Sequence, residues 1–266
     1  TCCLERRSGR CIIYMFMLFL LYFYLHRNIS LASYMKSDTV GTVLIGYWSL
    51  VNMNRLPQLW NHLNLDNLTA VFQDWGGILG LRVAARSPNR YKRLVLTNTV
   101  LPTCDKTYEG SNYIGPGFYN WKNFVRFGGL KGPGKIGKMM SRAARGPSCG
   151  PDGNLSKEDI EGYQAPFPND EYLAGANIFP ELVPTPPDDA TGRPQPEGGE
   201  VNRAMWNVYE NWTKPVLLAF SDGDPVLGGA GYIWEKKCPG CKGQPHVTLK
   251  GAGHFSQDGG GNQLTK

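Results

Sequence analysis

The stretch LTAVFQDWGGILGL, at residues 68–81, decides the fold of this chain. Its first part, Leu68–Phe72, is apolar and predicts a short buried strand. The apolar run stops abruptly at Gln73, and beyond two glycines a second apolar stretch, Ile78–Arg86, predicts a helix. A further strand is predicted at Arg93–Thr97, so the three elements form a βαβ unit, which is typical of a parallel sheet covered by helices.

Asp74 lies in the sharp turn between the first strand and the helix. A reactive side chain at such a turn is presented at the end of the strand and can act as a nucleophile. A carboxylate nucleophile forms an ester with its substrate, which suits displacement at an alkyl carbon better than attack on a carbonyl. The alternative is that Asp74 only caps the helix N-terminus. This segment alone leaves both interpretations open.

Two more loops with polar side chains follow predicted strands. SDGDP at 221–225 comes after the strand Pro215–Phe220, and GAGHF at 251–255 comes after the strand His246–Leu249. In doubly wound sheets, the loops after the carboxyl ends of strands carry function. Asp74, Asp224 and His254 stand in the chain order of nucleophile, acid and histidine that an α/β-hydrolase triad has. Asp222 is an alternative acid, and spacing alone does not exclude it.

Five blocks of the sequence together resemble the haloalkane dehalogenases. They are VFQDWGG at 71–77, FYNWK at 118–122, YQAPFPNDEY at 163–172, FSDGDP at 220–225 and GAGHFSQD at 251–258. The resemblance covers roughly residues 56–264. It implies an α/β-hydrolase fold, with a mostly parallel sheet flanked by helices and an inserted, mainly helical cap subdomain.

The resemblance also implies an activity, the hydrolysis of haloalkanes to alcohol and halide. Asp74 would attack the halogen-bearing carbon and form an alkyl ester, His254 would activate the water that opens this ester, and Asp224 would orient His254. The block that places the acid immediately before Pro225 favours Asp224 over Asp222. No metal or organic cofactor is implied. The expected partners are a small hydrophobic halogenated substrate, halide and water.

Two tryptophans, Trp75 after the nucleophile and Trp121 in the cap, would hold the departing halide. Indole is a hydrogen-bond donor on an apolar body, so two indoles in a dry pocket stabilise a leaving anion. For Trp121 the alternative is an ordinary aromatic residue of the cap core. Phe118, three residues earlier, would share a helical face with Trp121 and line the substrate pocket.

The sequence departs from the family in one respect. The family has an early strand followed by a His-Gly-x-Pro loop, which contributes a halide contact and a backbone N–H for the oxyanion. This chain has no His-Gly pair, and residues 1–50 resemble nothing in the family. We therefore expect the first strands to be missing or replaced, and the oxyanion site to keep only the N–H of Trp75.

Two other functions remain open. An epoxide hydrolase also uses an aspartate nucleophile, but it needs a cap tyrosine that protonates the epoxide oxygen. The candidates are Tyr108, Tyr113, Tyr119, Tyr163 and Tyr172. The tryptophan pair argues against this alternative. A non-catalytic ligand-binding relative, or an inactive fragment, is favoured by the departure in the first strands.

The length of 266 residues suits either one large α/β domain or a core with an inserted subdomain. We expect the first part of the core at 41–101, the cap at 102–199 and the second part of the core at 200–266. The cap region is rich in glycine, proline and aromatics, and the aromatics need burial. The remaining core elements are expected at Thr42–Ile45 (strand), Leu56–Leu63, Glu200–Asn211 and Gly229–Lys237 (helices).

Residues 1–40 are expected to lie outside the fold. The apolar run Cys11–Leu25 follows three arginines, as in a signal peptide or a short membrane anchor. The alternative is sequence foreign to the fold. The first interpretation predicts a secreted or membrane-anchored protein, and the second a cytoplasmic one.

The charged residues and the cysteines do not favour a nucleic-acid-binding or membrane-binding surface or a zinc site. The net charge is +6, but Lys and Arg are scattered, which does not favour a nucleic-acid or membrane patch. The CxxC spacing of Cys238–Cys241 has no second pair to complete a zinc site, so we interpret it as an incidental loop.

Overall fold

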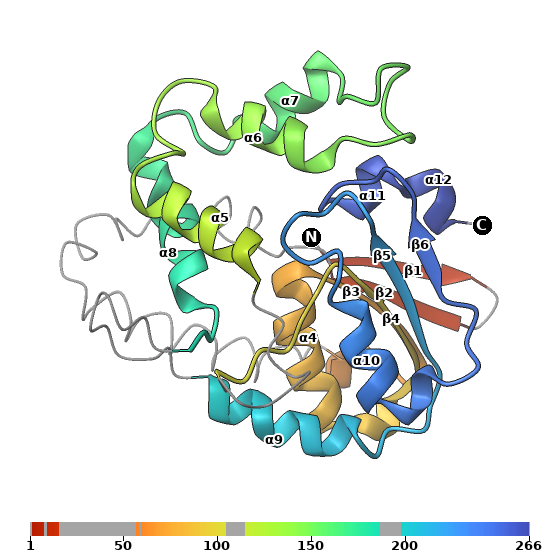
Figure 1. Ribbon diagram of the computed structural model, residues 1–266. Helices are drawn as coiled ribbons and strands as arrows, with labels where there is room; N and C mark the ends of the chain where they lie inside the picture. The colour runs from red at the N-terminus through yellow and green to blue at the C-terminus, as the bar shows by residue number, and fades with distance from the viewer. Residues whose placement is uncertain are drawn as a thin grey trace.

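The computed structural model describes residues 2–7, 10–15, 57–58, 60–104, 115–186 and 198–265. Within these ranges the chain forms a six-stranded sheet whose strands lie side by side in chain order (Figure 1). Its first pair is antiparallel and every later pair is parallel, which confirms the mostly parallel sheet. The strands are β1 (Cys2–Arg7), β2 (Arg10–Met15), β3 (Leu68–Gln73), β4 (Tyr91–Thr97), β5 (Val216–Ser221) and β6 (Val247–Leu249).

The sheet includes residues that the sequence predicted to lie outside the fold. Cys2–Arg7 and Arg10–Met15 pair with each other, and β2 pairs with β3. The expectation for residues 1–40 therefore does not hold for these two segments. The physical reason is that the run CIIY has high strand propensity and that an edge of β3 offers unpaired backbone groups. The rest of Cys11–Leu25 and the predicted strand Thr42–Ile45 lie outside the described residues.

Helices flank the sheet as predicted. α4 (Asp74–Arg86) packs against β2, β3 and β4, α9 (Gly199–Tyr209) packs against α4, and α10 (Gly231–Lys237) packs against β5. A one-turn 3₁₀ helix, η1 (Pro88–Arg90), leads from α4 into β4. Residues 57–58 and 60–62 are helical, at the place expected from the sequence. Of the helices in the described part of the chain, none is long and apolar enough to cross a bilayer.

An aromatic layer joins the two halves of the core. Trp206 and Tyr209 of α9 lie 4.6 and 5.2 Å from Trp234 of α10, measured between ring centroids. The indole N–H of Trp206 donates to the Leu101 carbonyl at 2.7 Å, and the Tyr209 hydroxyl donates to the Leu81 carbonyl at 2.6 Å. A buried donor without a partner costs about 1–3 kcal/mol, so these hydrogen bonds stabilise one position of α9 relative to α4. The halves of the core thus stay together although the cap separates them in sequence.

Cys238 and Cys241 belong to this same core. Both are buried, and Cys241 ends the one-turn 3₁₀ helix η3 (Pro239–Cys241). Their side chains are small apolar members of the main core, and η3 packs against α10 and β5.

The segment between β4 and α9 forms the cap, and the regular elements in its described residues are all helices, joined by turns and loops. In Figure 1 its helices gather away from the sheet, and they enclose a second hydrophobic core around Val125, Ile136 and Met140. Glu181 fixes two of these helices together, since it pairs with Arg126 at 2.8 Å and with Lys122 at 3.3 Å. The predicted mainly helical cap is thus confirmed. Its elements are α5 (Pro116–Arg126), α6 (Lys135–Ala144), α7 (Lys157–Gln164), η2 (Asp170–Leu173) and α8 (Ala174–Leu182).

The cap and the core meet above the carboxyl ends of the strands. Gly117, in the first turn of α5, lies against the Pro225 backbone so closely that a Cβ would overlap the Pro225 carbonyl. Phe255, from the loop after β6, is part of the cap core. Two short helices, α11 (Ser256–Gly259) and α12 (Gly261–Leu264), complete the described chain, and the glycines at 259–261 fall where the first ends and the second begins.

Candidate active site

Asp74 occupies a strained elbow between β3 and α4. Its φ is +49°, a left-handed conformation that non-glycine residues adopt at a cost of about 1–3 kcal/mol. The Asp74 N–H donates to the Asn98 carbonyl at 3.0 Å, and the Thr99 hydroxyl donates to the Asp74 carbonyl at 2.9 Å. A Cβ at Gly77 would collide with the Thr99 side chain, so this glycine allows the close approach. The elbow therefore holds the carboxylate at the end of β3.

The helix begins at Asp74, four residues before the predicted Ile78. The two glycines expected in the turn lie inside the first turn of α4. The N-cap position belongs to Gln73, and no side chain makes a capping hydrogen bond there. The interpretation of Asp74 as a simple N-cap is therefore wrong.

Asp224 holds one nitrogen of His254. Its side chain is fully buried, and its Oδ2 lies 2.8 Å from His254 Nδ1. Its Oδ1 accepts the backbone N–H groups of Val226 at 2.8 Å and Leu227 at 3.1 Å. Burial by itself would raise the pKa of Asp224, but the adjacent His254 and the two amides outweigh it and lower the pKa. The Asp224 carboxylate is thus ionised and fixed in orientation.

Asp222, the alternative acid, points elsewhere. Its Oδ1 accepts the N–H of Gly251 at 2.7 Å, and its Oδ2 lies 3.4 Å from Lys250 Nζ. Both contacts tie together the turns after β5 and β6, at the solvent-exposed side of the site.

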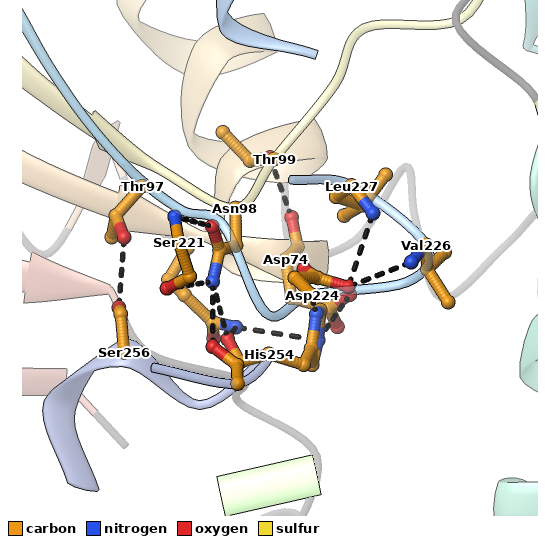
Figure 2. A network of polar contacts seen from close by, with 12 residues as sticks. Asp74, Thr97, Asn98, Thr99, Ser221, Asp224, Val226, Leu227, His254 and Ser256 are labelled. Atoms are coloured by element: carbon orange, nitrogen blue, oxygen red, sulfur yellow. Dashed lines mark hydrogen bonds and ion pairs between the residues drawn. The ribbon is translucent and has the colours of Figure 1, made fainter. Parts of the chain in front are cut away.

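The second nitrogen of His254 faces the elbow. His254 Nε2 lies 3.3 Å from Asp74 Oδ1. Burial lowers the pKa of His254, but the charges of Asp224 and Asp74 and their hydrogen bonds prevail, so its pKa is well above the ordinary value. The imidazole of His254 therefore lies between the carboxylates of Asp74 and Asp224 and contacts both, at the carboxyl edge of the sheet (Figure 2).

Asn98 and Gln73 complete the site, and sequence reasoning did not find their contacts. Asn98 Nδ2 donates to the His254 carbonyl at 2.8 Å and to the Ser221 hydroxyl at 2.9 Å, and its Oδ1 accepts the Ser221 N–H at 2.9 Å (Figure 2). Gln73 Nε2 lies 3.3 Å from His254 Nε2 and donates to the His254 carbonyl at 3.2 Å. Asn98 directly follows β4, so the rule that selected the loops after β3, β5 and β6 also applies to it.

A cavity of about 640 Å³ opens over this chain of contacts. The predicted site residues all border it, and its walls are mainly apolar. Trp75 packs edge-on against Phe179 of α8, with ring centroids 4.9 Å apart. Phe118 is buried, and the half-buried Trp121 stacks on Phe124 at 5.9 Å while it also packs against the cap core. Trp121 therefore satisfies both interpretations, as a wall of the cavity and as a member of the cap core.

The parallel sheet with its cap and the Asp–His–Asp contacts are those of an α/β-hydrolase. Comparison with known proteins identifies the family within this class. A family model described as alpha/beta hydrolase fold matches residues 35–260. The haloalkane dehalogenase of Psychrobacter cryohalolentis is 37% identical over 221 residues, which are 81% of this chain and 63% of the relative. That of Mycobacterium marinum is 33% identical over 85% of this chain and 68% of the relative. This chain belongs to the haloalkane dehalogenases.

The solved structures agree with this assignment. A haloalkane dehalogenase from Paraglaciecola agarilytica superposes with a TM-score of 0.60 at 28% identity, covering 77% of this chain and 61% of that one. The chain spans less than two thirds of the length of several relatives it matches, including 63% and 61% of two curated haloalkane dehalogenases.

Proposed function

We propose that this chain hydrolyses haloalkanes to an alcohol, a halide ion and a proton. One observation carries the proposal: the Asp74 carboxylate, the His254 imidazole and the Asp224 carboxylate lie in line on the floor of an apolar cavity. A desolvated carboxylate is a better nucleophile than a hydrated one, and an apolar cavity suits an uncharged alkyl halide. The whole reaction uses only the substrate and water.

In the first step, an Asp74 oxygen attacks the halogen-bearing carbon, and the carbon–halogen bond breaks as the ester bond forms. This step requires no proton transfer, because the halide leaves with its electron pair. The indole N–H groups of Trp75 and Trp121, which border the same cavity, are the proposed donors to the departing halide.

In the second step, His254 takes a proton from a water molecule that attacks the carbonyl carbon of the Asp74 ester. In the resting site two carboxylates raise the pKa of His254. Esterification removes the negative charge of Asp74, so the pKa of His254 falls and the imidazole becomes a base at the moment when one is needed. Asp224 then stabilises the imidazolium, and the Trp75 backbone N–H is the proposed donor to the oxyanion of the tetrahedral intermediate.

The contacts of the cap tyrosines favour this function over an epoxide hydrolase. Of the candidates within the described residues, Tyr163 borders the cavity. Its hydroxyl donates to Asp258 at 2.8 Å, and burial together with the charge of Asp258 raises its pKa. A phenol whose proton is held by a carboxylate is a poor acid for an epoxide oxygen. Tyr119 and Tyr172 are exposed and do not border the cavity, whereas Tyr108 and Tyr113 lie outside the described residues.

The proposal divides the chain at about residues 101 and 199, with the cap between the two parts of the core. This division is supported by the separation of the two hydrophobic cores, one around β3, β4 and β5 and one within the helices of the cap. The N-terminal boundary of the core includes β1 and β2.

Bromide or iodide should quench the fluorescence of Trp75 and Trp121 saturably, if these residues form the halide site. Trp121→Phe should weaken halide binding by about 1.5–3 kcal/mol, the worth of a hydrogen bond to a charged partner. Trp234→Phe, in the main core, is the control and should leave the halide affinity unchanged. Linear quenching that is identical in wild type and Trp121→Phe would assign Trp121 to the cap core alone and would favour the epoxide hydrolase.

A further inference from the structure

One wall of the cavity differs from the others in its charge. Lys135, Lys138 and Arg142 of α6 all border the cavity, and all three are exposed, so they lie where it opens to solvent. Their spacing of three and four residues puts them on one face of the helix, over about 10 Å of its length. The acidic residues that border the cavity are Asp74 and Asp224, which lie on its floor.

These three cations have no ion-pair partner within the described residues. Asp170, which contacts the segment before α6, accepts the backbone N–H of Gly132 at 2.8 Å. Glu181 of α8 is engaged by Lys122 and Arg126 of α5. Lys135 and Lys138 also stand in the first turn of α6, which contains no acidic residue. Positive side chains at a helix N-terminus are disfavoured by the helix dipole. The three side chains therefore concentrate positive potential at the mouth of the cavity, where it opens to solvent, and they do not stabilise α6.

We infer that the cavity prefers halogenated substrates that carry a carboxylate at the end opposite the halogen. The inference rests on the proposed function and specifies its substrate class. The carbon–halogen bond would face Asp74 on the floor, the alkyl chain would lie along the apolar walls, and the carboxylate would remain at the mouth beside Lys135, Lys138 and Arg142. Exposed cations contribute mainly by steering an anion to the mouth, so the preference depends on ionic strength.

The test compares 6-bromohexanoate with 1-bromohexane, which share the reacting carbon and differ at the far end. In wild type at low salt, kcat/KM should be higher for the acid. The variant Lys135→Gln/Lys138→Gln/Arg142→Gln should lose about tenfold in kcat/KM for 6-bromohexanoate, the lower end of electrostatic steering effects. It should change less than about twofold for 1-bromohexane, because the neutral substrate experiences no steering.

A charge-matched control separates the local effect from net charge. Lys92→Gln/Lys236→Gln/Lys242→Gln removes the same charge from exposed positions that do not border the cavity. This control should behave as wild type with both substrates. Equal kcat/KM for the two substrates in wild type, or equal losses in the two triple variants, would overturn the inference while leaving the dehalogenase function intact.

Absence of turnover with both substrates would count against the proposed function and not against the charged opening of the cavity. In that case, a binding measurement tests the inference. Hexanoate and 1-hexanol are unreactive probes, and Trp75 and Trp121 report occupancy of the cavity by fluorescence. We expect hexanoate to bind more tightly than 1-hexanol at low salt, and the α6 triple variant to lose that difference. Hexanoate binding that is no tighter than that of 1-hexanol would contradict the charged mouth.

Discussion

Asp74→Asn is expected to abolish halide release from 1-bromohexane, with a loss of roughly a thousandfold or more in kcat. The amide is close in shape to the carboxylate but is too weak a nucleophile to displace a halide. The substitution keeps the elbow, because the backbone bonds of Asp74 to Asn98 and Thr99 do not involve its side chain. The loss should therefore appear in turnover and not in the thermal unfolding temperature. Bromide release measured over time provides the readout.

Asp222→Asn is the matched control for this substitution. It makes the same chemical change in the neighbouring loop, where Asp222 contacts Gly251 and Lys250 but not His254. It should retain activity close to wild type. Normal turnover by Asp74→Asn, or a loss in Asp222→Asn that matches it, would show that the nucleophile is not Asp74.

His254→Phe is expected to stop the reaction after the first step. Displacement of the halide needs no base, but hydrolysis of the ester does. The variant should release up to one equivalent of bromide per protein and then stall, with the alkyl group bound to Asp74. Intact-mass spectrometry after incubation with 1-bromohexane should detect the mass of the hexyl group on the protein.

The control for this variant is His62→Phe. His62 is exposed in the helix before β3 and does not border the cavity, so its loss should leave turnover unchanged. The phenyl ring at 254 leaves Asp224 buried without its imidazole partner, and thermal unfolding will therefore show a lower midpoint than wild type. A folded His254→Phe protein that turns over normally, or that never becomes alkylated, contradicts the role of His254 as the base.

The loops around the site could be predicted from the sequence because each one directly follows a strand. Asp74 directly follows the buried strand β3, Asp224 and His254 lie in the loops after β5 and β6, and a parallel sheet brings the carboxyl ends of its strands to one edge. Spacing alone could not separate Asp222 from Asp224, and the family resemblance favoured Asp224. The structure directs Asp224 inward by two backbone N–H groups and leaves Asp222 at the surface.

Other features depended on contacts between distant segments. Asn98 binds Ser221 and the His254 carbonyl, more than 120 residues away, and no periodicity in the sequence records such pairs. The start of α4 at Asp74 was missed because two glycines resemble a turn, whereas Gly77 is required by the approach of Thr99. β2 was missed because the apolar run after Arg10 is as typical of a signal segment as of a strand. β1, with the sequence CCLERR, was missed because it contains no apolar run of strand length.

The source of the oxygen in the alcohol tests the central claim most directly. In the ester mechanism, Asp74 supplies this oxygen and water restores the carboxylate. In a single turnover in water labelled with ¹⁸O, with protein in excess over 1-bromohexane, the 1-hexanol should contain unlabelled oxygen and the peptide that includes Asp74 should gain ¹⁸O. Labelled 1-hexanol together with an unlabelled Asp74 peptide would mean that water attacks the alkyl carbon directly, and would contradict the ester mechanism.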